Sequence, residues 1–469
     1  MKKLAWLLAL MLLVVSLAPV GALAEEEITL TYAVWDFYDV YNYMADKYEA
    51  THPGIKVEIL ELGGTDVFMS NLGNLAAESK FPDVFQHLNL DACIQNGWFA
   101  DITEYVEVDE EYQKNLFPSL QRGGFIDGKR CFYVPNKIMP VVVYLDQNVF
   151  KKENVELPPA DWTWDDMINL METMTRPDMQ LWAYNSFLGI LSIGPVALAE
   201  NAIAEFGWDG ENYHFEDGWA DCITQEAEYR RLNYRADSDP NYATIMGDVW
   251  AGNSGHVAMQ HDAWWTMQWT YSASDSAERA VSMIPYAVPA STDVTVSNAL
   301  SFIDMGAVSS STKHPAEAFD LLKYMSYGKE GTLAKIEAYA NLKNEDGSVI
   351  YRVPDWTPMT TDEEVWDAYW ALYQTNDAEY WADKNVDWDT LEKQLQRPVP
   401  LGGVAIPGFN TFLAEVYSGS DYNGTVGIEA AVFGGVADPY DYTEMLNQKG
   451  REYYDNIMKV LYDVYGTAE

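Results

Sequence analysis

The chain has 469 residues, of which 48% are hydrophobic, and its formal net charge at pH 7 is -43. That hydrophobic content excludes general disorder, and the length is sufficient for two or three core-forming units. A surface this acidic repels phosphate backbones and anionic lipids, so we expect no nucleic-acid partner.

The first residues have the pattern of an export signal. Residues 2 and 3 are lysines, residues 4–20 are an almost unbroken apolar run, and residues 22–24 are the small-x-small sequence Ala-Leu-Ala. We therefore expect a signal peptide, residues 1–24, that is cleaved after Ala24. The mature protein is then exported and is either periplasmic or extracellular and associated with the cell surface.

The chain has three cysteines, Cys93, Cys131 and Cys222. None follows the predicted cleavage site, so the lipobox cysteine of a lipoprotein is missing and we expect a soluble form. Three cysteines are too few for a disulfide scaffold, and one bridge with a free thiol or three buried thiols fit equally well. No Cys/His spacing resembles a zinc site, and we expect neither a metal nor a cofactor.

After the signal, the chain alternates between strand and helix patterns. Apolar residues alternate in 28–34 and in 55–59, the period of a strand, and a third strand begins at Pro82. Between them, apolar residues recur at helical spacing in 40–48 and 68–76. This order predicts a parallel sheet with right-handed crossovers, whose ligand crevice lies beyond the carboxyl ends of the strands. That rule selects three short segments: Trp35-Asp36, residues 63–65 and Gln86-His87.

The later elements have weaker patterns. Thr163 and Asp166 form a capping-box pattern, and Pro315 suits a first helical position. Residues 207–240 and 347–400 are rich in aromatic and acidic residues and show no internal repeat. The predicted elements are strands at 131–135 and 139–145, a helix from Thr163, strands at 257–260 and 281–288, a helix from Pro315 and a last helix over 446–464.

Several segments, in their order and spacing, resemble one known family. They are residues 48–57 with the Pro53-Gly54 turn, Phe81-Pro82-Asp83-Val84, Asp127-Gly128-Lys129 with Tyr133-Val134-Pro135, residues 143–146 with Phe150, Trp162-Thr163-Trp164, residues 255–259 and residues 309–325. The chain thereby resembles the extracellular solute-binding proteins of family 1, the maltose-binding-like group that serves ABC importers. The resemblance covers residues 28–325 well and the last helix weakly, whereas residues 341–441 match poorly.

The resemblance implies an α/β, two-lobed periplasmic-binding-protein-like fold, a type II clamshell in which each lobe is a mainly parallel sheet flanked by helices. It implies crossovers near residues 137–142 and 298–302. It also implies two partners, a carbohydrate captured by hinge closure and the transmembrane permease subunits of an ABC transporter, and we expect a monomer. By analogy, lobe 1 consists of residues 25–138 and 300–340, and lobe 2 of residues 139–299 and 341–469 with the C-terminal helices.

A sugar presents apolar C–H faces and a rim of hydroxyl groups, so its site needs flat aromatic rings and planar polar side chains. Trp35 and Asp36 lie just beyond the first strand, and the family often places a stacking aromatic where Trp264 and Trp265 stand. We expect His261 and Asp262 to lie in the same loop as these two tryptophans, after the strand at 257–260. Gln86, Asn136 and Ser301 rest on topology alone. The candidate ligand-binding residues are Trp35, Asp36, Gln86, Asn136, His261, Asp262, Trp264, Trp265 and Ser301.

Two other functions stay open. A secreted polysaccharide-degrading enzyme would need two carboxylates at a fixed separation, but 72 Asp and Glu residues make such pairs uninformative here. The same fold would also suit a peptide, a polyamine or a phosphodiester, although the acidic charge favours neutral or cationic ligands. The Gly-rich segment 123–130 lacks the Ser or Thr of a phosphate-binding loop. We therefore expect a receptor without catalytic residues, and not an enzyme.

Overall fold

The computed structural model of the chain describes residues 27–186, 194, 203–247, 250–272, 283–290, 297–381, 386–419 and 427–467. The predicted signal peptide, residues 1–24, lies outside this range. Among the helices of the described residues, none has the length and hydropathy that crossing a membrane requires.

The first lobe begins with the three parallel strands that the alternating pattern predicted. Its elements are β1 (Ile28–Val34), α2 (Tyr38–Thr51), β2 (Ile55–Glu61), α3 (Phe68–Ala77), β3 (Val84–His87), α4 (Leu90–Asn96), α5 (Thr103–Val108), α6 (Glu110–Lys114) and α7 (Pro118–Gln121). β1 pairs parallel with both β2 and β3. Leu30, Tyr32 and Val34 of β1 are buried, whereas β2 at the edge is only partly covered. Tyr38–Thr51 packs against this sheet through the predicted apolar face.

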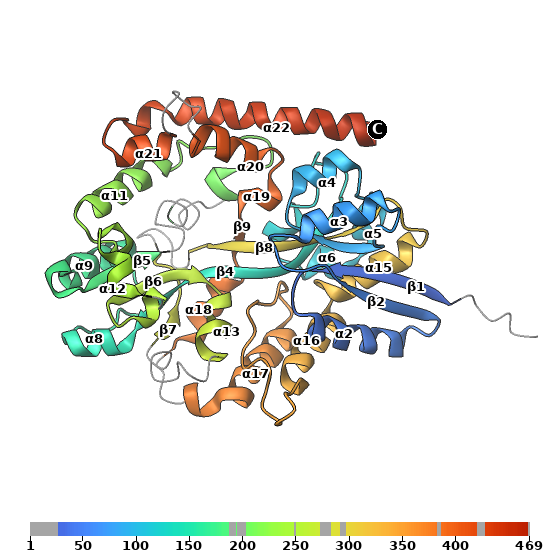
Figure 1. The fold of residues 1–469 in the computed structure, drawn as a ribbon, viewed down its shortest axis with the longest axis horizontal. Helices are drawn as coiled ribbons and strands as arrows, with labels where there is room; N and C mark the ends of the chain where they lie inside the picture. The colour runs from blue at the N-terminus through green and yellow to red at the C-terminus, as the bar shows by residue number, and fades with distance from the viewer. Residues whose placement is uncertain are drawn as a thin grey trace, which may run out of the picture.

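Two long strands connect the lobes, β4 (Val134–Asp146) and β8 (Ala299–Val308). They run side by side through the middle of the molecule (Figure 1). β4 pairs antiparallel with β8 up to Pro140, and from Val141 onward its partners belong to the second lobe. At its far end β8 pairs antiparallel with β3, so one sheet extends through both lobes.

The prediction of two short strands at 131–135 and 139–145 was wrong, because β4 is one continuous strand. Pro135 and Pro140 lie inside it and lack the amide hydrogen that a ladder uses, which disguises the strand in the sequence. The register of β4 against β8 shifts between Pro135 and Lys137, and this irregularity accommodates the first proline. All thirteen residues of β4 are buried.

The second lobe has a mixed sheet. Its elements are α8 (Gln147–Glu153), α9 (Trp164–Met174), η1 (Pro177–Met179), β5 (Trp182–Ser186), η2 (Glu205–Gly207), α11 (Trp219–Arg231), η3 (Ala236–Ser238), α12 (Tyr242–Met246), η4 (Ala251–Asn253), β6 (Val257–Ala263), α13 (Trp265–Ser272) and β7 (Met283–Tyr286). β6 and β7 flank β4 in antiparallel pairing, and β5 pairs parallel with β6. The predicted capping box of α9 is confirmed, since Thr163 and Asp166 each accept a bond from the other's backbone amide.

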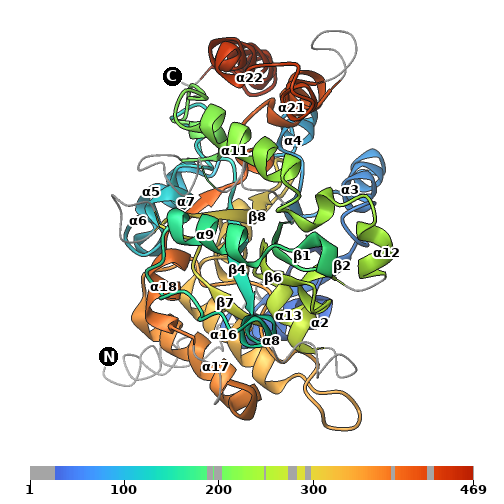
Figure 2. The same cartoon turned by 90° about the vertical axis from the view of Figure 1, so that its left-hand side faces the viewer.

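The C-terminal part contacts both lobes. It comprises α15 (Pro315–Met325), α16 (Lys329–Asn341), α17 (Glu363–Trp381), α18 (Trp388–Leu395), β9 (Pro398–Pro400), α19 (Gly402–Ala405), α20 (Phe409–Phe412), the π-helical η6 (Leu413–Tyr417), α21 (Ile428–Phe433), η7 (Pro439–Asp441) and α22 (Thr443–Tyr465). α21 and α22 lie on the opposite side of β4 and β8 from α16 and α17 (Figure 1 and Figure 2). The last helix, predicted over 446–464, extends across to α4 of the first lobe.

The buried apolar residues of both lobes form one large cluster, with a small second cluster around Trp182. Cys93, Cys131 and Cys222 are buried and unpaired, so of the two cysteine arrangements the three thiols are observed. Within the described residues, no group of three His, Cys, Asp or Glu side chains is placed to hold a metal ion.

A candidate ligand-binding cleft between the lobes

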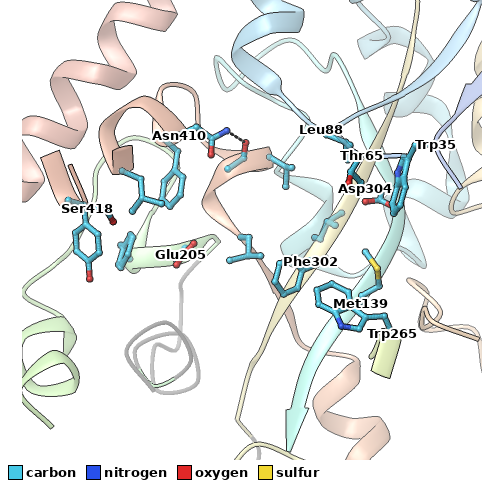
Figure 3. A pocket seen from close by; sticks show the side chains of 18 of the residues that line it. Trp35, Thr65, Leu88, Met139, Glu205, Trp265, Phe302, Asp304, Asn410 and Ser418 are labelled. Atoms are coloured by element: carbon cyan, nitrogen blue, oxygen red, sulfur yellow. Dashed lines mark hydrogen bonds between the residues drawn. The ribbon is translucent and has the colours of Figure 1, made fainter. Parts of the chain in front are cut away.

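A cavity of about 640 Å³ lies where the crossing strands meet the C-terminal part. It is large enough for a small-molecule ligand. Figure 3 shows side chains that approach it from two directions. The hinge wall consists of Trp35, Thr65, Leu88, Met139, Trp265, Phe302, Ile303 and Asp304, and the C-terminal wall of Glu205, Phe206, Leu401, Gly403, Val404, Phe409, Asn410, Leu413, Tyr417, Ser418 and Glu429.

Two of the predicted residues, Trp35 and Trp265, lie in the hinge wall. Trp35 directly follows β1, at the carboxyl end of the strand, where the crevice of a parallel sheet is expected. Trp265 begins α13, and its ring centroid lies 4.5 Å from that of Phe302 on β8. Phe302 and Met139 come from the two crossing strands, so residues of the first lobe, the second lobe and the hinge line one wall.

Gln86 and Asn136 lie behind this wall in a buried hydrogen-bond network. The Gln86 amide nitrogen donates to the Asn136 side-chain oxygen over 2.8 Å and to the Tyr41 hydroxyl over 2.9 Å. The Asn136 amide nitrogen donates to the hydroxyl of Tyr32. The Gln86 side-chain oxygen accepts from the backbone amide of Trp35, at 3.2 Å. Both predicted residues therefore hold the first lobe together and position Trp35, but neither lines the cavity.

Asp36 belongs to a buried cluster of charged side chains around Lys137 of β4. The ammonium nitrogen of Lys137 on β4 lies 2.5 Å from Asp36, 3.3 Å from Asp355 and 3.4 Å from Asp304. Of these carboxylates only Asp304 lines the cavity. Burial, partly opposed by Lys137, raises the pKa of Asp36 to about 7. Burial opposes the charge on Lys137 too, but the three carboxylates outweigh it and hold the pKa of Lys137 above its ordinary value.

The same ammonium group contacts the candidate stacking ring. The Lys137 nitrogen lies 4.6 Å from the centroid of Trp35, a cation–π contact. A second buried lysine, Lys335, lies 4.4 Å from the ring centroid of Trp356. Burial and the nearby Lys137 lower the pKa of Lys335 to about 8. Through Lys137, Trp35 therefore contacts the charge cluster that joins the strands of the hinge.

His261 and Asp262 lie on β6 and not in a loop after it, because the strand continues to Ala263. His261 is buried, and its Nδ1 lies 3.2 Å from the Tyr184 hydroxyl. Burial lowers the pKa of His261 to about 3, so the ring is neutral. Asp262 accepts a hydrogen bond from the indole nitrogen of Trp250. Neither residue lines the cavity.

Trp264 and Ser301 also lie outside the lining. Trp264 is fully buried, and its indole nitrogen donates to the hydroxyl of Tyr369 on α17 over 2.8 Å. The Ser301 hydroxyl is buried and donates to the carbonyl of Ala299. Of the adjacent tryptophans 264 and 265, the first therefore packs into the core and the second lies at the cavity.

The C-terminal wall was not predicted from the sequence. Its residues come from η2 and from 401–429; neither segment has a clear periodicity, and 401–429 lies outside the resemblance. Phe206 has a left-handed backbone, with φ 56°, which turns the short η2 segment sharply. Glu205 beside it is 6% exposed and accepts a hydrogen bond from the Gly402 amide at 3.3 Å. Burial raises the pKa of Glu205 to about 7. The Phe206 and Tyr417 rings lie 5.3 Å apart.

Three solved structures share this fold over almost the whole chain. An ABC substrate-binding protein from Listeria monocytogenes, in complex with cycloalternan, has 17% identity and a TM-score of 0.60, covering 93% of this chain and 99% of that one. A sugar transporter protein from Rhizobium etli, in an open conformation, has 16% identity and a TM-score of 0.63 over 90% of this chain and 99% of that one. The sugar-binding protein MalE from Xanthomonas citri has 13% identity and a TM-score of 0.63 over 92% and 98%.

The sequence also matches a family model, which is described as bacterial extracellular solute-binding protein. The match covers residues 35–326, more than half of the chain, from Trp35 to the end of α15. It includes both crossing strands and the whole hinge wall. The two-lobed fold, the cavity between the lobes and this match agree, and the chain therefore belongs to the bacterial extracellular solute-binding protein family.

Proposed function

We propose that this protein is an exported receptor that captures a carbohydrate and delivers it to the permease subunits of an ABC importer. The observation that carries the proposal is the cavity between two lobes, lined by aromatic rings on both walls. Trp35, Trp265 and Phe302 offer flat faces for the apolar side of a sugar ring. Asp304 and Asn410 offer polar groups for its hydroxyls. The three structural neighbours support it, since their descriptions name cycloalternan or sugars.

Hinge closure is the proposed reporting mechanism. The exchange of strand partners along β4 at Pro140 and Val141 supports a first crossover within 137–142, and the pairing of Ser301 on β8 with Pro140 supports a second near 298–302. A ligand that touches both walls stabilises the closed arrangement by its differential affinity for that state. The proposed lobe segments are those expected from the resemblance, with α22 bridging from residues 341–469 to the first lobe.

We further propose binding without turnover, by a monomer whose signal peptide ends at Ala24. The extracellular family supports export. Prolonged incubation with oligosaccharides, followed by an assay for new reducing ends, separates a receptor from a polysaccharide-degrading enzyme. Sustained product formation would overthrow the receptor.

The binding site is tested by a thermal-shift screen across mono-, di- and oligosaccharides, repeated with Trp35→Ala and Trp265→Ala. We expect a sugar that raises the melting temperature of the native protein and a loss of about tenfold or more in affinity in each variant. Trp98→Ala is the matched control, because Trp98 is also half-buried in the first lobe but packs on Phe81, away from the cavity. Equal affinity in all three variants would rule out the cavity as the sugar site.

A further inference from the structure

One end of the cavity combines a buried carboxylate with aromatic rings. This acidic end consists of Glu205, Phe206, Phe409, Tyr417 and Glu429 of the C-terminal wall. The ring of Phe206 lies 5.3 Å from that of Tyr417 and 6.0 Å from that of Phe409, measured between centroids. Figure 3 shows Glu205 on the side of the cavity away from Trp35 and Asp304.

Among the described residues, no basic side chain forms an ion pair with the carboxylate of Glu205. It is 6% exposed, and its hydrogen-bond donor is the neutral amide of Gly402. No ion pair joins it to any of the described basic side chains. Glu429 is partly buried too, and burial raises its pKa although Arg230 and Arg235 act in the opposite direction.

The described lining of the rest of the cavity supplies no compensating charge. Among the described residues that line it, none is a lysine, an arginine or a histidine, while three are Asp or Glu. Lys137 lies behind Asp304 and shares its charge with Asp36 and Asp355. Burying a carboxylate without a cation costs free energy, because the charged group loses its hydration. The free protein already incurs this desolvation cost when it folds.

We propose, building on the carbohydrate receptor proposed above, that the acidic end of the cavity receives a protonated amine of the bound sugar. An ammonium group placed there forms a charge-assisted hydrogen bond to Glu205 and lies against the faces of Phe206, Phe409 and Tyr417, the combination that recognises cations in aromatic-lined sites. The hinge wall stacks on the sugar ring, so one ligand uses both ends. The substrate class is an amine-bearing sugar.

Three other sugar types fit this end less well. An N-acetylated or unsubstituted sugar leaves Glu205 without a cation, so it forms no charge-assisted hydrogen bond there and is limited to neutral donors. A uronic acid brings a second negative charge next to Glu205 and Glu429 and is excluded by repulsion. The acidic net charge of the whole chain acts in the same direction on the approaching ligand.

The experiment measures affinity by calorimetry near pH 7 for a matched set: a glucosamine oligomer, its N-acetylated form, the unsubstituted glucose oligomer and the glucuronate oligomer, in the linkage that the thermal-shift screen selects. We expect the amine form to bind about tenfold or more tightly than the N-acetylated form, and no binding of the glucuronate. Glu205→Gln should abolish the difference between the amine form and the N-acetylated form. Glu444→Gln, an exposed position on α22 outside the cavity lining, is the control and should keep the preference.

The outcomes separate this inference from the function on which it rests. Equal affinity for the amine and the N-acetylated oligomer, or a preference that survives Glu205→Gln, overturns the amine site while leaving the sugar receptor in place. If no member of the set and no sugar of the screen binds, the receptor proposal fails and the amine site fails with it. A preference that is present in the native protein and in Glu444→Gln but absent in Glu205→Gln supports both.

Discussion

At the residue scale, Lys137 connects the hinge to the cavity. Its ammonium group neutralises part of the negative charge of three buried carboxylates, and it contacts the ring of Trp35. Asp304 in the same cluster lines the cavity. A ligand that changes the hydrogen bonding of Asp304 or the position of Trp35 therefore acts directly on the group that joins β1 to the crossing strands.

Replacing Lys137 by methionine should destabilise the protein strongly. The substitution leaves three buried carboxylates without their main cation, and breaking a buried ion pair in this way costs about 3–5 kcal/mol. Lys335→Met is the matched control, since burial and Lys137 already lower the pKa of Lys335 and its charge is less well compensated. Urea denaturation of both variants gives the free energies of unfolding. A loss at Lys335 equal to that at Lys137 would contradict the assigned roles.

Glu205 should make the stability of the free protein depend on pH. Its pKa rises from an ordinary value of 4.5 to about 7 on folding, through burial. The folded state then binds the proton more tightly than the unfolded chain, so this contribution to stability is present below about pH 4.5 and is lost as the pH rises through about 7. The neighbouring Gly402 amide and the phenols of Tyr213 and Tyr417 stay neutral over this range.

The size of this effect has an upper limit of about 3–4 kcal/mol, from 1.36 kcal/mol for each pKa unit. Chemical denaturation of the native protein and of Glu205→Gln between about pH 4.5 and 8 measures it. The difference in unfolding free energy between the two proteins should change steadily up to about pH 7 and then level off. A difference that is constant with pH would show that Glu205 titrates normally.

At the element scale, α22 holds the C-terminal part against the first lobe. The backbone amide of Phe99 donates to the Tyr465 hydroxyl at 3.1 Å, and Arg130 donates to the Tyr465 carbonyl at 3.1 Å. The methyl groups of Val464 lie close to Gly97 at the end of α4. The final turn of α22 therefore binds this long helix to the first lobe.

Tyr465→Phe should loosen this contact. It leaves the buried amide of Phe99 without its acceptor, which costs about 1–3 kcal/mol. Tyr462→Phe, on the same helix with an exposed ring, should change stability by less than about 0.5 kcal/mol. Urea unfolding of the two variants provides the comparison, and hydrogen exchange of the Phe99 amide locates the change. Equal effects would show that the Tyr465 hydroxyl bond is not formed in solution.

At the scale of the whole molecule, one sheet runs through both lobes and makes a hinge of two strands. β4 and β8 are two of the connections along which the lobes can rotate without separating the sheet. The cavity lies against these strands, so a ligand bound in it would contact both the hinge and the C-terminal part. Under the proposed function, this placement couples ligand binding to molecular shape.

Saturating sugar should decrease the radius of gyration, because closing the lobes makes the molecule more compact. Small-angle X-ray scattering of the native protein with and without the sugar that the screen identifies measures this change. Trp35→Ala at the same sugar concentration should retain the radius of the free protein. A radius that is unchanged in saturated native protein would exclude closure as the signal that the importer receives.

Much of the fold was determined by local sequence patterns. Residues 28–34 and 55–59 alternate with the period of a strand, and the stripes at 40–48 and 68–76 repeat with that of a helix, so the parallel start of the first lobe was predictable. Trp35 could be placed at the cavity for the same reason, since it follows directly on a predicted strand. These features depend on residues that are neighbours in the chain.

Only the tertiary structure decided the rest of the site. Tryptophans 264 and 265 have the same local sequence, and the end of β6 turns the first into the core and the second to the cavity. Glu205 and Phe206 lie beside Phe409 and Tyr417, which are about 200 residues away in the chain. A periodic pattern in the sequence does not predict a contact of this kind. Side chains that are brought together by packing across lobes carry no signal in the sequence around them, because their proximity is created by the fold.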